Sequence, residues 1–438
     1  MFIEKENKKL QFTYFILIPL LVIFRDVLGI EINKIFFISI QIIFVLLSGK
    51  KDLIYIIVFI FPFLCGVPGT YIMLINLIAY MYKFKQVNKK VFLFSLYAFI
   101  LEVFVSIVFK NFKLVDIIQY VEYLMIFLLL IYNKMNINYK KIIQISIGSF
   151  LSTVLIIAVE SVQKAPQNWF YLFRKGWYRF GDKFRTIEDG MTLSLNANNL
   201  AYYCIVGISI SLLLFIKEKN KLIKIIYFFC MILFLIIGAL SLSRSFVLVL
   251  LIIIFLIFVS NVKNLKKMLL GIFFIFIFVG AAIIILQKNT LILEGMITRF
   301  TSETMSTGGG RTTLTISTFT EWIGNYFYVL FGTSISSYNE TMVGKAGQIH
   351  CGLLQILYVY GIIAAPILLY ILINPVYILH KKYRIEIIYF IPWVSVIIFT
   401  QTIQFLNPTF LMFPYLLGIY SIKYGKTMER RSYKWKRC

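Results

Sequence analysis

The sequence predicts an all-α, polytopic integral membrane protein with about 12 to 14 transmembrane helices and a large outer loop containing amphipathic helices. Of its 438 residues, 60% are hydrophobic and 14% are charged, and the mean hydropathy is +0.86. A soluble domain could not bury that much apolar surface. Apolar stretches of roughly 17–25 residues recur almost end to end, and each is long enough to cross a bilayer as a helix.

The first region, 1–163, is predicted to hold seven N-terminal transmembrane helices. Its first apolar stretch resembles a signal peptide but lacks a small-residue cleavage site, so we expect it to stay as a span. The segment 61–71, FPFLCGVPGTY, allows either one broken span or a re-entrant hairpin, which is why the count is a range. The spans are expected near 12–30, 33–48, 52–65, 68–84, 91–109, 114–132 and 140–163.

The rest of the chain alternates spans with two long polar segments. An outer loop at 164–192 precedes transmembrane helices in 193–286, and a second, larger outer loop at 287–349 precedes the C-terminal helices in 350–422. A basic cytoplasmic tail, 423–438, ends the chain. The spans here are expected near 193–216, 221–241, 245–260, 268–286, 351–373, 386–404 and 408–422.

The net charge of +25 does not indicate nucleic-acid binding, because the charges fall in short clusters between apolar runs. Of the 44 Lys and Arg residues, 29 lie in segments on the side of the N-terminus and five lie in short turns on the other side. The positive-inside rule therefore predicts cytoplasmic N- and C-termini. The five outer residues are Arg25, Lys34, Lys110, Lys113 and Arg244.

The sequence predicts neither a metal nor another cofactor. It contains no P-loop and no HExxH motif, and its five cysteines are scattered singly. The two outer loops are instead rich in Trp, Tyr, Arg and Gly, and long loops on a rigid bundle are where binding and catalysis usually concentrate.

Three polar residues are expected at helix N-termini on the outer side: Arg244, Arg311 and His350. A cation there is disfavoured by about 0.3–1 kcal/mol unless an anion docks, and free N–H groups with guanidinium groups suit phosphate. The same dipole favours a neutral imidazole, which a general base needs. Arg311 follows GGG and shares one face of a predicted amphipathic helix with Leu314, Thr318 and Trp322.

Each feature also has a simpler interpretation. Arg244 could contact lipid headgroups, GGGR could be a flexible link, and His350 could be an interfacial polar residue. Asn196 and Asn198 could cap a helix or bind sugar hydroxyls. The aromatic and basic segment 168–185 could stack on sugar rings or lie among headgroups. Acidic residues in or near spans are either functional or paired within the bundle: Glu102, Asp116, Glu122 and Glu160.

The motifs NANNLA, SLSRS, GGGRTTLTISTFTEW and HCGLLQ occur in the order typical of the O-antigen ligase and polymerase superfamily, which this chain resembles over roughly 190–370. In that family we expect Asn-Pro-Asn-x-x-Ala, a Ser-Arg turn, an Arg with Trp about eleven residues later, and a His-Asn start to a late span. Two positions depart from the pattern, because Ala197 replaces Pro and Cys351 replaces Asn.

The resemblance implies a glycosyltransferase acting on oligosaccharide carried by undecaprenyl diphosphate. Arg244 and Arg311 would hold the diphosphate, His350 would activate the attacking hydroxyl, and Asn196, Asn198 and Trp322 would help bind substrate. The function expected is an O-antigen or capsule repeat-unit polymerase, with a ligase that transfers the glycan to lipid A core or another acceptor as the alternative. Membrane lipids, a chain-length regulator and a flippase of the same pathway are the expected partners. A polysaccharide flippase or transporter is the alternative from another class.

Overall fold

The computed structural model describes most of the chain, and helices make up 81% of it, with no strand among the described residues. These observations confirm the all-α polytopic membrane fold. The residues outside the description are 1–5, 86–87, 109–112, 136, 182–192, 194, 262–293, 296, 299–310, 336–350, 384, 407–408 and 436–438.

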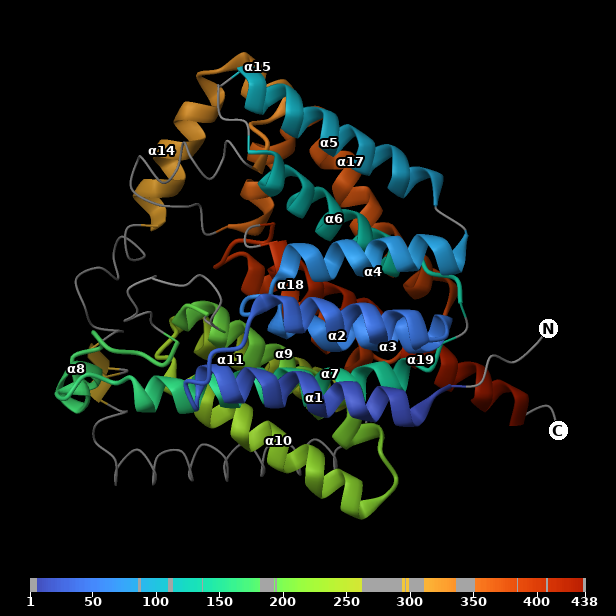
Figure 1. The fold of residues 1–438 in the computed structure, drawn as a ribbon, viewed down its shortest axis with the longest axis vertical. Helices are drawn as coiled ribbons and strands as arrows, with labels where there is room; N and C mark the ends of the chain where they lie inside the picture. The colour runs from blue at the N-terminus through green and yellow to red at the C-terminus, as the bar shows by residue number, and fades with distance from the viewer. Residues whose placement is uncertain are drawn as a thin grey trace.

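The N-terminal region forms a layer of roughly parallel and antiparallel helices across the middle and top of the molecule (Figure 1). In the 61–71 segment, a short 3-10 helix, Phe61–Phe63, and a turn follow α3, and α4 begins at Gly69. The helices are α1 Lys8–Asp26, α2 Lys34–Leu47, α3 Lys50–Ile60, α4 Gly69–Phe84, α5 Lys89–Val108, α6 Leu114–Ile131 and α7 Tyr139–Gln163.

The second half packs α9 against α10, α7 and α18, and places α17 beside α15. Its predicted span near 268–286 lies outside the described residues. The helices are α8 Trp169–Arg174, α9 Ala197–Lys217, α10 Lys221–Leu240, α11 Arg244–Asn261, α14 Arg311–Ile323, α15 Tyr326–Phe331, α17 Gly352–Lys382, α18 Ile391–Thr400 and α19 Phe413–Trp435.

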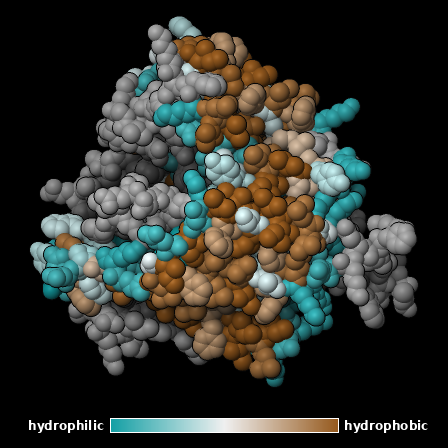
Figure 2. All heavy atoms as spheres, in the orientation of Figure 1, coloured by the Kyte–Doolittle hydropathy of each residue, from teal (hydrophilic) through white to brown (hydrophobic). Residues whose placement is uncertain are grey.

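Six helices in the described part of the chain are long and apolar enough to cross a membrane. The predicted total of about 12 to 14 spans stays a prediction, because other apolar helices are shorter and part of the chain is outside the description. Large apolar side chains such as Phe12, Leu46 and Ile100 point outward. Figure 2 shows the resulting apolar band, flanked by hydrophilic residues at both ends of the helices.

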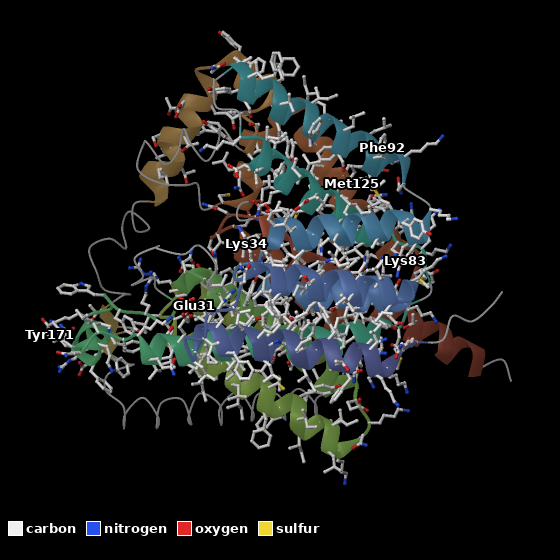
Figure 3. All side chains as sticks on the ribbon, in the orientation of Figure 1. Glu31, Lys34, Lys83, Phe92, Met125 and Tyr171 are labelled. Atoms are coloured by element: carbon white, nitrogen blue, oxygen red, sulfur yellow. The ribbon has the colours of Figure 1, made fainter. Side chains whose placement is uncertain are left out.

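The bundle has two ends, which we name by what they carry. The terminal end lies toward both chain termini and includes Lys83, whereas the loop end includes Glu31, Lys34 and Tyr171 (Figures 1 and 3). The lysine and arginine counts predicted Lys83 on the side of the N-terminus and Lys34 on the opposite side, and the two residues lie at opposite ends of the bundle. Which end faces the cytoplasm stays a prediction.

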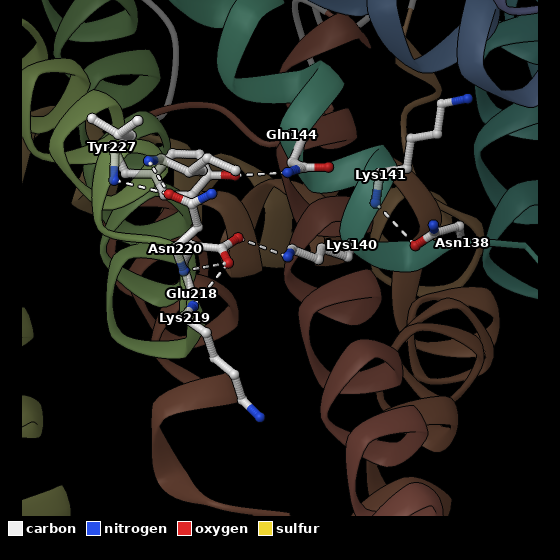
Figure 4. Close-up of polar contacts among 10 residues, drawn as sticks. Asn138, Lys140, Lys141, Gln144, Glu218, Lys219, Asn220 and Tyr227 are labelled. Carbon is white, nitrogen blue, oxygen red and sulfur yellow. Dashed lines mark hydrogen bonds and ion pairs between the residues drawn. The ribbon is translucent and has the colours of Figure 1, made fainter.

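Polar contacts join separate helices at the terminal end (Figure 4). Lys140 Nζ lies 2.7 Å from Glu218 Oε2, and Lys141 Nζ lies 2.5 Å from Glu6 Oε2. The hydrogen bond from Lys140, together with those from the backbone N–H groups of Asn220 and Lys219, lowers the pKa of Glu218 to about 2. The segments before α1, at the start of α7 and after α9 are thereby linked.

Two lysines at this end cap the C-termini of neighbouring helices. Lys83 Nζ donates to the Val45 carbonyl at 2.7 Å, near the end of α2, and Lys423 Nζ donates to the Ile131 carbonyl at 2.8 Å, at the end of α6. The last carbonyls of a helix have no partner within it, and the negative end of its dipole attracts a cation. The basic residues therefore also stabilise the helix ends.

Candidate functional site

The site is built from helix starts and irregular segments at the loop end. The first is the start of α9, where Asn196 is the N-cap and its Oδ1 accepts from the Asn199 N–H at 2.8 Å. This contact confirms the capping interpretation of Asn196, and its role in substrate binding stays a prediction. The Oδ1 of Asn198 accepts from Ser243 Oγ at 3.2 Å, which joins the NANNLA motif to the SLSRS turn.

The SLSRS turn connects α10 to α11. Leu242 has a φ of +48°, a costly conformation for a residue with a branched side chain, and the Phe246 ring packs so closely on Gly238 that a Cβ there would overlap it. Helix α11 begins at Arg244, as predicted. The strained turn, its contact with Asn198 and the tight packing together fix the position at which α11 begins.

Asp26 holds the chain that leads into α9. Its carboxylate is buried, accepts from Arg25 Nε at 2.8 Å and Arg25 Nη2 at 2.9 Å, and also accepts from the Leu193 N–H at 2.9 Å. Gly66 lies directly against Leu193, where a Cβ would overlap the backbone. The carboxylate therefore anchors the segment that carries Asn196 and Asn198.

The aromatic segment after α7 folds back over the same region. Tyr178 OH donates to the Ser161 carbonyl, and the Phe180 N–H donates to the Leu240 carbonyl at 3.2 Å, next to the SLSRS turn. Trp177 stays 68% exposed. These contacts attach part of 168–185 to the bundle. Whether the segment stacks on sugar rings or lies among lipid headgroups stays open.

Helix α14 begins at Arg311, as predicted for the sequence after GGG. Thr318 and Trp322 are buried and Leu314 is half-buried, so the predicted amphipathic face is confirmed for these three residues. The Trp322 indole Nε1 donates to the Tyr328 carbonyl at 2.9 Å. The described contact of Trp322 is therefore with α15, and its predicted role in substrate binding stays a prediction.

The segment after α15 enters a break in α17. Gly361 has φ 62° and ψ −178°, which interrupts the helix and releases carbonyl groups one turn earlier. The Thr333 N–H donates to the Tyr358 carbonyl at 3.0 Å, and the Ser334 N–H donates to the Val359 carbonyl at 3.2 Å. Irregular backbone within a membrane bundle requires such partners.

Glu102 of α5 completes this attachment. Its side chain is buried, and Oε1 accepts from the Ile335 N–H at 2.5 Å. The sequence marked Glu102 as either functional or paired, and this contact shows that it holds the chain that follows α15.

Helix α17 begins at Gly352 with Cys351 as its N-cap, which confirms a helix start directly after His350. His350 itself lies outside the described residues, as does the side chain of Arg311. Gly352 packs against the turn after α18, where a Cβ would stand 2.8 Å from the Thr400 carbonyl oxygen.

Gln355 is fully buried, and its Oε1 accepts from the N–H groups of Phe405 and Leu406 at 2.8 and 2.9 Å.

The structure brings Asn196, Asn198 and Arg244 into one connected region, and it places Arg311 at the start of a separate helix, α14. Sequence reasoning missed Asp26 and Gln355. Asp26 could have been found as an acidic residue directly after an apolar span, and Gln355 as an amide one turn inside the helix that follows His350.

No group of three or more His, Cys, Asp and Glu side chains suited to a metal occurs in the part of the chain that the structure describes. Comparisons with protein-family models, with curated proteins and with solved structures each found no match for this chain. Any functional assignment therefore rests on the residues and their placement.

Proposed function

We propose that this chain is an O-antigen or capsule repeat-unit polymerase at the outer face of a bacterial inner membrane. It would transfer an oligosaccharide from undecaprenyl diphosphate to a sugar hydroxyl, by metal-independent glycosyl transfer with inversion. The termini would lie in the cytoplasm, so the loop end would face outward.

The observation that carries this proposal is the placement of three helix starts. Helices α11 and α14 begin at Arg244 and Arg311, and α17 begins two residues after His350. A helix N-terminus carries partial positive charge, so an arginine there is favourable mainly when an anion docks. A diphosphate, which carries several charged oxygens, suits that arrangement.

In the proposed reaction, Arg244 and Arg311 bind the diphosphate and stabilise the charge that develops as it leaves. His350 accepts the proton of the attacking hydroxyl, and a new glycosidic bond forms as the bond to the diphosphate breaks. The Asn198–Ser243 contact supports the proposal because it holds the turn before Arg244 in place.

The test replaces Arg244, Arg311 and His350 singly with Ala in cells that make the polymer. Each variant is expected to insert normally and to lose long-chain polysaccharide on a gel. Arg244→Lys should also be poor, because an ammonium lacks the bidentate geometry of a guanidinium. Lys34→Ala is the matched control, since it removes an exposed basic residue at another helix start of the loop end, the first residue of α2.

Wild-type chain lengths in all three Ala variants would overturn the proposal. The orientation has its own test, because a cysteine introduced by Gly309→Cys should react with an impermeant reagent on intact cells. Reaction only after permeabilisation would place the loop end in the cytoplasm.

A ligase of the same superfamily is the closest alternative, since the motifs are shared. The two differ in product: a polymerase extends chains on the carrier lipid, whereas a ligase moves finished chains to lipid A core or another acceptor. If the protein is a polymerase, an inactive Ala variant should leave single repeats on the acceptor. If it is a ligase, an inactive variant should leave long chains on the carrier lipid.

A transporter is favoured by one observation, the buried polar groups deep in the bundle. Tyr14 OH, Gln41 and Asn76 form a hydrogen-bonded chain with distances of 2.5 and 2.6 Å, and Glu122 is buried in α6. Such groups within spans often mark transport pathways. If Glu122→Gln abolishes polymer export while Arg244→Ala leaves it intact, the transporter is the better assignment.

A further inference from the structure

The start of α17 contains a buried hydrogen-bond donor with no acceptor. Gln355 is 0% exposed, and its Nε2 contacts no hydrogen-bond partner among the described residues. The amide orientation is fixed, because two backbone N–H groups, those of Phe405 and Leu406, point at Oε1. Leaving such a donor unsatisfied is costly in a folded protein, so a partner is expected.

The position of this donor indicates what the partner is. Side chains in a helix lean toward its N-terminus, and Gln355 belongs to the first full turn of α17, whose first N–H groups have no partner within the helix. The N-cap residue, Cys351, provides no side-chain hydrogen bond to those groups. The helix dipole adds partial positive charge at the same place.

Among the described residues, the groups that remain available at the start of α17 are therefore donors. The Oε1 of Gln355 is already occupied by two N–H groups, which leaves the amide able to donate but not to accept. Donors at a helix N-terminus without a cap match the oxygens of a phosphate. We infer that the start of α17 is a phosphate-binding element in which Gln355 Nε2 donates to a phosphate oxygen.

This inference rests on the proposed function, because the phosphate would belong to the lipid-linked substrate. Gln355 follows His350 by five residues, so the phosphate would bind close to the group that accepts the proton. The same chemistry is offered by a phospholipid headgroup, and the experiment separates these two sources.

The test measures binding of inorganic diphosphate to the full-length purified protein in nanodiscs, for wild type and for Gln355→Glu. The glutamate keeps an oxygen for the Phe405 and Leu406 N–H groups, replaces the NH2 donor by an acceptor and adds one negative charge. We expect a melting temperature close to wild type and diphosphate binding weakened by roughly 10-fold or more.

Gln163→Glu is the matched control, because it adds the same charge at the loop end, at the exposed last position of α7. It should bind diphosphate within about 2-fold of wild type. Equal binding by Gln355→Glu and wild type would overturn the inference and assign the donor to a water molecule. An equal loss of diphosphate binding in Gln355→Glu and Gln163→Glu would overturn the inference too, since a general effect of the added charge would then explain the loss.

Nanodiscs containing undecaprenyl phosphate and nanodiscs containing phosphatidylglycerol distinguish the two sources. Competition with diphosphate only by undecaprenyl phosphate assigns the site to the carrier lipid, whereas equal competition assigns it to a headgroup. The proposed function can fail separately: wild-type chain lengths in Arg244→Ala, Arg311→Ala and His350→Ala would reject the function even where Gln355→Glu binds diphosphate weakly.

Discussion

At the terminal end of the bundle, charged side chains join regular helices to one another, whereas at the loop end similar side chains hold irregular backbone. Lys140 and Glu218 connect α7 to the turn between α9 and α10, and Lys423 caps α6. Toward the other end, Asp26 and Glu102 accept from the backbone N–H groups of Leu193 and Ile335. The first arrangement stabilises a frame, and the second holds shaped segments of the kind that carry binding sites.

The largest expected difference between the ends concerns buried and exposed ion pairs. Asp26→Ala leaves Arg25 largely buried without its carboxylate and should cost about 3–5 kcal/mol. Glu386→Ala breaks the pair with Lys217 at the terminal end, where the glutamate side chain is 64% exposed, and should cost less than about 1 kcal/mol. Thermal unfolding in detergent measures both, and equal losses would contradict the contrast.

The next largest loss of stability is expected from a substitution at the break in α17. Gly361→Ala forces a left-handed φ on alanine and overlaps the Leu330 carbonyl, so we expect a loss of about 2 kcal/mol or more. Gly148→Ala is the control, because that helical glycine has open space around it, and its stability should change by about 1 kcal/mol at most. A harmless Gly361→Ala would mean that the break is not required.

Two asparagine N-caps, one at each end of the bundle, allow the same substitution to be compared at both ends. Asn196→Ala and Asn220→Ala each remove an N-cap, of α9 and α10, and each should cost about 1 kcal/mol in the melting assay. Only Asn196→Ala should also lower the polymer yield several-fold, because its cap lies beside the contact with Ser243. Similar yields from the two variants would remove the link between this cap and the site.

The smallest effect is pH dependence at the terminal end. The folded pKa of Glu218, about 2, lies below the ordinary value of 4.5, so its stabilising contribution is present above pH 4.5 and is lost as the pH falls toward 2. Wild type should therefore melt higher than Glu218→Gln at pH 6, and the gap should narrow at pH 3. A gap that is constant with pH would show that the Lys140 contact adds nothing.

Much of the fold could be predicted because it depends on local patterns. The apolar stretches predicted the helices, GGG before Arg311 predicted the start of α14, and the spacing of Leu314, Thr318 and Trp322 predicted its inward face. The break in α17 could not be predicted, since YVYGII has the apolar character of an ordinary span. It is stabilised by N–H groups of Thr333 and Ser334, from a segment far away in the sequence.

The sequence by itself determined the membrane class, the positions of most helices and the helix starts at Arg244 and Arg311, because hydropathy and helix-breaking residues act over short distances along the chain. Only the tertiary structure decided that Asp26 anchors Leu193, that Asn198 contacts Ser243 and that Gln355 has an unsatisfied donor. Each of these depends on which polar groups meet when the helices pack, and buried polar groups must find partners wherever the fold places them.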